Sequence, residues 1–159
     1  MRKLAMALSI LLGIVPFGVR AGDAILEISG KTDMTASQSV NLSLQEFDAI
    51  DQSTVVTKTP WHKEVTTFSG VSGRALLEYL GSNAKSVEAV ALNDYKVIIP
   101  VSDLLEQGLI FATRKDGAPM SIREKGPIFV VYPFDADTKL NNEVIYGRSI
   151  WQVKALNFQ

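Results

Sequence analysis

Short apolar segments, bounded by turn-forming residues, constrain the fold of this 159-residue chain most strongly. Ala24–Ser29 alternates apolar and polar residues, Thr54–Thr59 is rich in β-branched residues, and Ile128–Tyr132 is an uninterrupted apolar run. Segments of this length with these patterns are typical of β-strands. Ile150–Phe158 alternates again and predicts a closing strand.

Cap signals predict short helices between these strands. Ser43-Leu44-Gln45-Glu46 has the spacing of a capping box, in which the serine hydroxyl and the glutamate carboxylate each accept from the other residue's backbone amide. Ser72 is the expected N-cap of a helix that runs through Leu80. Ser102 is the expected cap of a short helix that ends at Gly108.

Two hairpins and one irregular segment complete the pattern. Asn93-Asp94 predicts a tight two-residue turn, because both residues tolerate positive φ. Lys115-Asp116-Gly117 is a second hairpin signal, and we interpret the polar, weakly patterned residues Phe134–Arg148 as a surface excursion. Because no regular βαβ alternation appears, the sequence predicts an α+β protein with mixed or mostly antiparallel sheets and a few short helices.

The first 21 residues have the pattern of a secretory signal peptide. Arg2-Lys3 forms a positive n-region, and Leu4–Val19 is an apolar stretch. Val19-Arg20-Ala21 places small residues where a signal peptidase cleaves, so we expect cleavage after Ala21. A membrane-spanning helix is the alternative, but Pro16 interrupts the stretch near its end.

The type of signal predicts both the compartment and the state in which the chain is exported. No arginine pair precedes the apolar stretch, so we expect export of an unfolded chain that carries no cofactor inserted in the cytoplasm. We therefore predict a periplasmic protein that is not inserted in the membrane after cleavage. Residues 22–159 form one expected domain, because no linker divides these 138 residues and this length suffices for one core.

Composition excludes several kinds of partner and chemistry. The chain contains no cysteine, so neither a disulfide nor a thiolate ligand is available. Without residues 1–21, 13 basic residues stand against 17 acidic ones, a formal net charge of −4. Such a balance gives no reason to expect nucleic acid or anionic lipid as a partner.

Four sequence stretches follow one another in a characteristic order. They are FSGVSGRALLEYLG at Phe68–Gly81, ALNDYKVIIPVSDL at Ala91–Leu104, TRKDGAPMSIREKGPIFVVYP at Thr113–Pro133 and SIWQVKALNF at Ser149–Phe158. In this order and spacing, the chain from Trp61 to Trp151 resembles the oxidoreductase molybdopterin-binding domain family, the core fold of sulfite oxidase. The resemblance implies the fold of that domain and points to molybdopterin, the molybdenum cofactor, as the family's ligand.

One departure from that family bears directly on activity. The family holds its metal through a cysteine on the strand before the first glycine–helix unit, and the corresponding position here falls near Thr57–Thr59. A neutral hydroxyl is a poor metal ligand beside a thiolate. The family's arginine-rich turn is also missing, replaced by Thr59-Pro60-Trp61. We therefore expect the fold without a bound cofactor and without catalytic or metal-ligating residues.

Six residues are candidates for lining a residual ligand cleft: Thr57, Thr59, Trp61, His62, Tyr95 and Arg148. His62 is the single histidine, and two interpretations are open, a ligand contact that titrates near neutral pH or an ordinary surface residue. Trp61 and Trp151 either line a pocket or pack in the core. Arg148 lies where the family has basic residues near a substrate anion, but a lone arginine also commonly forms a salt bridge.

The leading hypothesis is a periplasmic, non-redox protein that binds a small ligand or a partner protein, including a membrane sensor. It predicts a residual cleft. A first alternative is a molybdenum-cofactor-dependent oxidoreductase with a non-cysteine metal ligand, which predicts a deep pocket with backbone amides around a phosphate. A second alternative is a structural subunit without a pocket, which predicts a large exposed apolar patch. Of the three, the first alternative alone is an enzyme.

Overall fold

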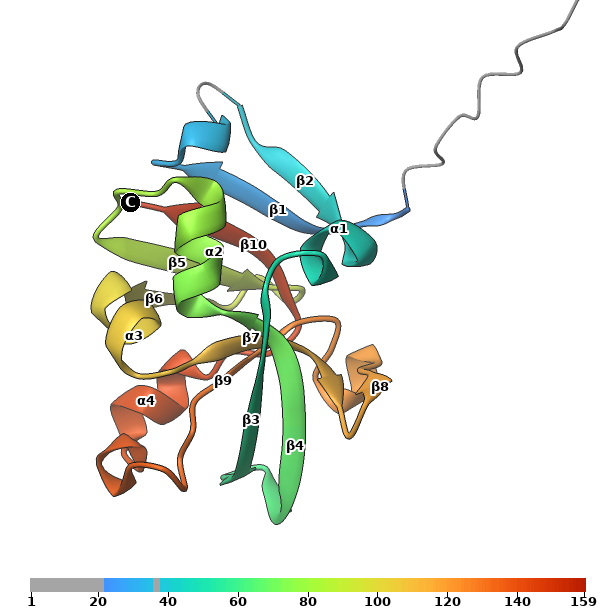
Figure 1. Ribbon diagram of the computed structural model, residues 1–159, viewed down its shortest axis with the longest axis vertical. Helices are drawn as coiled ribbons and strands as arrows, with labels where there is room; N and C mark the ends of the chain where they lie inside the picture. The colour runs from blue at the N-terminus through green and yellow to red at the C-terminus, as the bar shows by residue number, and fades with distance from the viewer. Residues whose placement is uncertain (1–21, 36–37) are drawn as a thin grey trace, which may run out of the picture.

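The computed structural model describes residues 22–35 and 38–159, which form two β-sheets with short helices around them (Figure 1). The expected signal peptide, residues 1–21, lies outside the described residues. Within the described ranges, no helix is long and apolar enough to cross a membrane. The expected α+β class with mixed and antiparallel sheets is confirmed.

The first sheet has five strands in the order β2-β1-β10-β5-β6. Their bounds are β1 Ala24–Gly30, β2 Val40–Ser43, β5 Ser86–Ala91, β6 Lys96–Pro100 and β10 Val153–Phe158. The C-terminal strand β10 lies at the centre, parallel to β1 and antiparallel to β5. The sheet is therefore mixed, and its middle strand follows the other four in chain order.

The second sheet is antiparallel throughout and contains β3, β4, β7, β8 and β9. Their bounds are β3 Gln52–Thr59, β4 His62–Ser72, β7 Ile110–Lys115, β8 Ala118–Pro119 and β9 Phe129–Val131. Strands β3 and β4 form a long hairpin that extends away from the first sheet (Figure 1). Two residues, Pro60 and Trp61, connect them.

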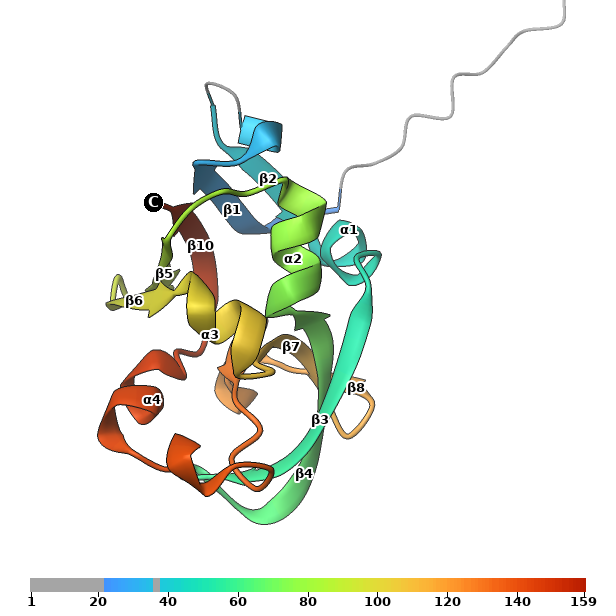
Figure 2. The same ribbon diagram turned by 60° about the vertical axis from the view of Figure 1, so that its left-hand side comes forward.

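In the described part of the chain, four α-helices connect the strands: α1 Leu44–Asp48, α2 Gly73–Leu80, α3 Val101–Glu106 and α4 Glu143–Arg148. The capping box at Ser43 and the N-cap at Ser72 form as expected. The expected cap at Ser102 was wrong, because the N-cap of α3 is Pro100, which makes no side-chain cap bond. Helices α2 and α3 pack against each other (Figure 2), and Gly73 permits this because a Cβ there would lie 2.7 Å from the Leu104 Cα.

The two expected hairpins form, with one difference. Asp116 and Gly117 both have positive φ, which suits the tight connection between β7 and β8. The connection between β5 and β6 is four residues long, 92–95, rather than two, and within it the backbone amide of Ala91 donates to the carbonyl of Tyr95. Asp94, with φ 65°, adopts the left-handed conformation that closes this loop.

The segment 134–148 is more structured than a surface excursion. It contains a 3-10 helix at Thr138–Leu140 and the helix α4. Phe134, Leu140 and Ile145 are buried in the main core. The sequence pattern missed this because three apolar residues among many exposed polar ones do not produce a clear period.

Alternate residues of β7 and β9 divide the apolar interior into two clusters. Phe111 and Val130 point into the main cluster, which both sheets and the helices share. Ile110 and Phe129 point to the opposite face of the second sheet, into a smaller cluster that Trp61 and Trp151 complete. The second cluster therefore lies on the face of the second sheet that is turned away from the main core, and both tryptophans pack against it.

Candidate functional site

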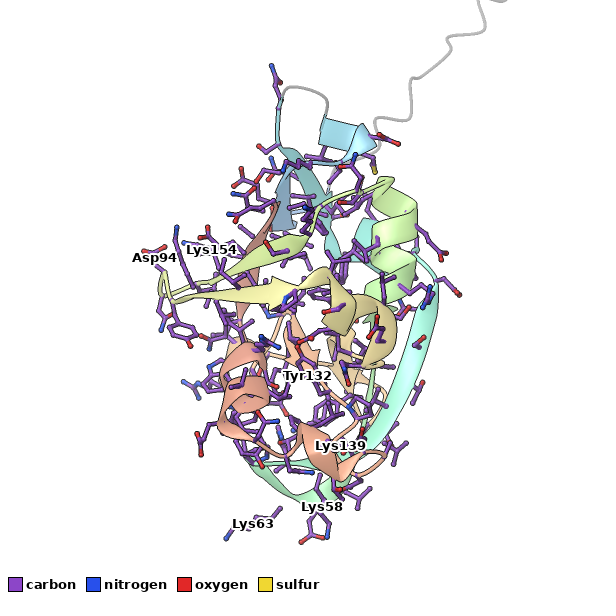
Figure 3. All side chains as sticks on the ribbon, turned by 90° about the vertical axis from the view of Figure 1, so that its left-hand side faces the viewer. Lys58, Lys63, Asp94, Tyr132, Lys139 and Lys154 are labelled. Atoms are coloured by element: carbon purple, nitrogen blue, oxygen red, sulfur yellow. The ribbon has the colours of Figure 1, made fainter. Side chains whose placement is uncertain are left out.

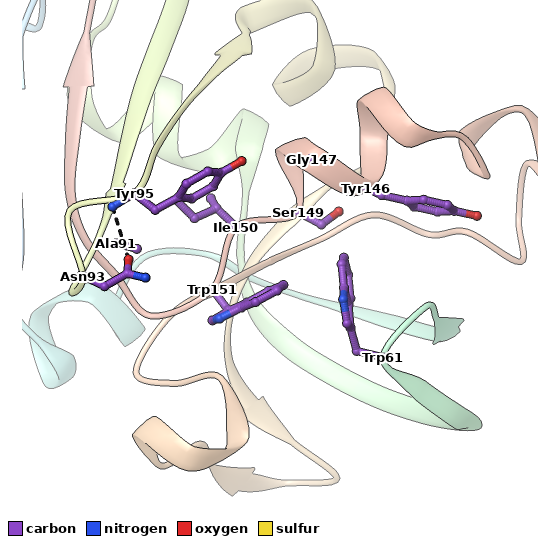
Figure 4. A pocket seen from close by; sticks show the side chains of 9 residues that line it. All are labelled: Trp61, Ala91, Asn93, Tyr95, Tyr146, Gly147, Ser149, Ile150 and Trp151. Carbon is purple, nitrogen blue, oxygen red and sulfur yellow. Dashed lines mark hydrogen bonds between the residues drawn. The ribbon is translucent and has the colours of Figure 1, made fainter.

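A pocket of about 360 Å³ opens where three separate parts of the chain meet (Figure 4). They are the β3–β4 turn, the β5–β6 hairpin and the segment from α4 to the start of β10. Nine residues line it: Trp61, Ala91, Asn93, Tyr95, Tyr146, Gly147, Ser149, Ile150 and Trp151. This volume is enough for a small organic molecule.

Backbone geometry directs the two tryptophans toward each other. Trp61 sits in the two-residue turn between β3 and β4, and Trp151 forms an isolated β-bridge with Phe129 just before β10. Gln152, with φ 55°, turns the chain sharply after Trp151. The two indole rings meet edge to face, with centroids 5.1 Å apart and planes at 71°. Each ring also packs edge to face on Phe129, so the pocket wall rests on the second apolar cluster.

Lys125 lies over the Trp151 ring, with Nζ 3.7 Å from the ring centroid. The same ammonium is 5.4 Å from the Trp61 centroid and 5.9 Å from that of Phe129. All three distances are within the range of a cation–π interaction. Burial lowers the pKa of Lys125 from its ordinary value. Lys125 is not part of the pocket lining, so it supports one pocket wall from outside.

Among the residues that the structure describes, no charged side chain lines the pocket, and its polar side chains include several hydrogen-bond donors. The Asn93 side-chain oxygen accepts from the backbone amide of Tyr95, which leaves the Asn93 NH₂ group free to donate. The Tyr95 hydroxyl is on an exposed ring, and within the described ranges it has no protein partner. The Ser149 hydroxyl is different, because it already donates to the carbonyl of Ile145.

Thr59 and His62 form a compact hydrogen-bonded turn beside the pocket but outside its lining. The Thr59 hydroxyl oxygen accepts from the backbone amides of Trp61 and His62. It is also 2.8 Å from His62 Nδ1. Burial first, and then the positive charges of Lys115 and Lys125, lower the pKa of His62 below 6.5, against a smaller opposing effect of Asp116.

Thr57 is fully buried under the loop that follows β9. Its hydroxyl donates to the Lys58 carbonyl and accepts from the backbone amide of Asp135. The Asp135 carboxylate in turn accepts from the Lys58 amide. Thr57 therefore joins β3 to this loop and has no free hydroxyl to offer a ligand.

Arg148 is directed into the interior rather than into the pocket. Its guanidinium donates to the Asp103 carboxylate at 2.9 Å, and the buried Tyr132 hydroxyl donates to the same oxygen at 2.8 Å. Burial, followed by the Asp103 charge, raises the pKa of Tyr132. Figure 3 shows Tyr132 within the molecule, whereas Asp94 and Lys154 form their ion pair on the outside.

Of the six residues expected at the cleft, Trp61 and Tyr95 line the pocket. Thr57, Thr59, His62 and Arg148 lie outside its lining. The structure adds Tyr146 and Ser149, which the sequence did not indicate because they belong to a segment without a clear pattern. Lys125 was also missed, since a lone lysine before Gly126 carries no signal of an aromatic contact.

The described part of the chain contains no metal-binding group of histidine, cysteine, aspartate or glutamate side chains. The chain as a whole has no cysteine. Near Thr57–Thr59, where the resemblance would place the family's metal ligand, the Thr57 and Thr59 hydroxyls are buried and already hydrogen-bonded. These residues do not fit a molybdenum centre, which requires an anionic, accessible donor.

The fold is similar to that of the sulfane dehydrogenase SoxCD from Paracoccus pantotrophus, with a TM-score of 0.64 and 14% sequence identity. The similarity covers 87% of this chain and 38% of the SoxCD chain, so this chain spans less than half the length of that neighbour. The expected sulfite-oxidase-like molybdopterin-domain fold is thereby confirmed, here without cysteine. No family model matches the sequence, and no curated protein matches it.

Proposed function

We propose that this protein binds a small organic ligand in the aromatic pocket and carries out no redox chemistry. One observation carries the proposal: four aromatic side chains and a free amide donor surround a pocket of about 360 Å³ on a fold that lacks its metal ligand. The four are Trp61, Tyr95, Tyr146 and Trp151. A mostly apolar pocket with a few directed polar groups is typical of a small-molecule site.

The donor chemistry argues against molybdenum-dependent activity. A high-valent metal needs a charged, polarisable ligand, and the chain has no thiolate. Ionising the buried Thr57 or Thr59 hydroxyl instead would remove the proton that Thr57 donates to the Lys58 carbonyl, or the one that Thr59 shares with His62 Nδ1. The oxidoreductase alternative would therefore require the β3 region to rearrange.

Export to the periplasm is part of the proposal, with the sequence pattern of residues 1–21 as its support. A ligand-binding protein there delivers its ligand, or reports it, to a partner. A membrane sensor is the partner that we propose. The pocket wall formed by Tyr95 lies on the exposed β5–β6 hairpin, so a bound ligand would change a surface that such a partner can contact.

Two measurements on protein purified from its native periplasm test the proposal. Native mass spectrometry, followed by extraction, should find a small organic molecule bound at one site. Metal and pterin analysis of the same sample should find no stoichiometric molybdenum. Molybdenum and pterin at one equivalent each would contradict the proposal and favour the oxidoreductase alternative.

A matched pair of tyrosine variants localises the binding. Tyr95→Ala removes a pocket wall, and Tyr79→Ala removes an exposed tyrosine of α2 that is outside the pocket. We expect Tyr95→Ala to weaken binding of the extracted ligand about tenfold, by analogy with the loss of one aromatic contact. Tyr79→Ala should bind as the unmodified protein does. Equal affinities for both variants would place the ligand elsewhere.

A further inference from the structure

We propose that the pocket selects planar ligands without positive charge that carry hydrogen-bond acceptors, and that Lys125 sets this selectivity from behind the Trp151 ring. The inference rests on the proposed function of the pocket as a ligand site. Four aromatic walls would otherwise favour an organic cation, because ring faces carry negative potential. The position of Lys125 reverses that preference.

Lys125 contacts the Trp151 ring from outside the pocket lining. Nζ lies 3.7 Å from the Trp151 centroid, yet Lys125 does not line the pocket. In Figure 4, Tyr95, Ile150 and Ser149 lie on one side of the Trp151 ring. Because Lys125 touches this ring and does not line the pocket, we infer that a ligand stacked on the pocket face of Trp151 has the ammonium behind the ring.

No carboxylate neutralises this ammonium within residues 22–35 and 38–159. Among the neighbouring charges, Glu124 pairs with Lys115, and Asp94 pairs with Lys154. The groups in contact with Lys125 are the Trp61, Phe129 and Trp151 rings. The positive field of the Lys125 ammonium therefore reaches the pocket with little compensation by negative charge. Burial also lowers the pKa of Lys125, which agrees with an ammonium surrounded by aromatic rings.

Magnitudes decide between attraction and repulsion for a cationic ligand. A cation on the pocket face would be about 7 Å from Nζ. At an effective dielectric constant of about 20, the repulsion between two unit charges at this distance would weaken binding of the cation about fiftyfold. A cation–π contact at a partly exposed site would strengthen binding of the same cation only about twofold to fivefold. Screening by salt reduces the repulsion, so we expect net discrimination of about tenfold against a cation.

The hydrogen-bonding groups favour the same class of ligand. The Asn93 NH₂ group and the Tyr95 hydroxyl are available donors at the pocket. The Trp61 and Trp151 indole N–H groups are two more, since in the described part of the chain neither has an acceptor in the protein. A ligand with carbonyl, carboxylate or ring-nitrogen acceptors would satisfy these donors, whereas an ammonium would not.

Three probes with one ring system separate charge from shape: 2-naphthoate, 2-naphthamide and 2-naphthylmethylammonium. Isothermal titration calorimetry at neutral pH and low salt should show the carboxylate and the amide binding about tenfold or more tightly than the ammonium. Lys125→Met keeps the side-chain length and removes the charge, so the ammonium should then bind at least as tightly as the amide. Lys125→Arg keeps the charge and should preserve the original order.

Lys85→Met is the control for net charge. Lys85 is exposed and precedes β5 at the end opposite to Ala91, about 20 Å from the pocket at the rise of a β-strand. Lys85→Met should leave the order of the three probe affinities unchanged. If all three probes bind the unmodified protein equally, or Lys125→Met and Lys85→Met behave alike, the role of Lys125 is overturned while the pocket stands. If no probe binds at millimolar concentration, the proposed function fails with it.

Discussion

At the scale of single residues, the Thr59 hydroxyl determines the tautomer of His62. Its oxygen already accepts two backbone amides, from Trp61 and His62, so its one proton is the donor to His62 Nδ1. Nδ1 is therefore the acceptor in the neutral ring, and Nε2 carries the proton. Protonation of Nδ1 would replace this hydrogen bond by an unfavourable contact between two donors, which adds to the effect of burial on the pKa.

The pKa of His62 should therefore lie below 6.5, as measured by NMR titration of the single histidine. Thr59→Val removes the hydroxyl donor and should raise this pKa, whereas Thr59→Ser should retain the lowered value. Thr59→Val should also destabilise the fold by about 1–3 kcal/mol, because two backbone amides lose their acceptor. A pKa at or above 6.5 in the unmodified protein would contradict the assigned hydrogen bond.

The sign of the linked stability effect follows from this pKa. The unfolded chain binds the His62 proton first as the pH falls, because its pKa is near 6.5 and the folded value is lower. The contribution of neutral His62 is complete above pH 6.5 and is lost as the pH falls from 6.5 through the folded pKa. Denaturant unfolding should show a smaller loss of stability over this interval in His62→Gln than in the unmodified protein.

At the scale of secondary-structure elements, one buried carboxylate holds three of them together. Asp103 of α3 accepts from Arg148 at the end of α4 and from Tyr132 just after β9. Its side chain is 8% exposed and that of Arg148 is 24% exposed, so solvent screens the pair only weakly. Because α4 leads directly to Ser149 and Trp151, this contact also positions one wall of the pocket.

Asp103→Asn should lower the free energy of unfolding by about 2–3 kcal/mol, since it leaves the half-buried Arg148 without its counter-charge. Denaturant unfolding measures this loss. Asp94→Asn is the matched control, because the Asp94–Lys154 pair is on the surface and its loss should leave the midpoint unchanged. Similar midpoints for both variants would show that the Asp103 contact contributes little.

At the scale of the whole molecule, the two apolar clusters share the strands β7 and β9. Phe111 and Val130 belong to one cluster, and Ile110 and Phe129 belong to the other. Neither cluster can be exposed without distorting strands that support its neighbour. A domain of this size with such shared strands is expected to unfold as one cooperative unit.

Two spectroscopic probes test this cooperativity. Both tryptophans pack against the second cluster, so their fluorescence reports on it, whereas far-UV circular dichroism reports on all strands and helices. The two unfolding curves should have the same midpoint. Met120→Ala, a large-to-small change in the second cluster, should lower both midpoints together by about 2–3 kcal/mol in stability. A fluorescence transition that precedes the dichroism transition would show that the clusters unfold separately.

Local patterns predicted much of the fold because neighbouring residues alone determine caps and tight turns. The capping box at Ser43, the N-cap at Ser72 and the Asp116-Gly117 turn all form as expected. The expected cap at Ser102 failed because the chain enters α3 from the strand β6, whose last residue, Pro100, takes the N-cap position. The expected two-residue turn at Asn93-Asp94 was wrong, because the two strands end further from the turn and four residues, 92–95, connect them.

The sequence by itself determined the fold class, through strand-length apolar runs and local caps, and it excluded a thiolate metal centre, because no cysteine is present. Tertiary structure alone decided the site. Trp61, Tyr95 and Trp151 come from three distant parts of the chain, and strand pairing brings them together. It also directed Arg148 inward to Asp103 and placed Lys125 over the Trp151 ring. Contacts between residues so far apart in the chain depend on the packing of whole sheets, which no local pattern encodes.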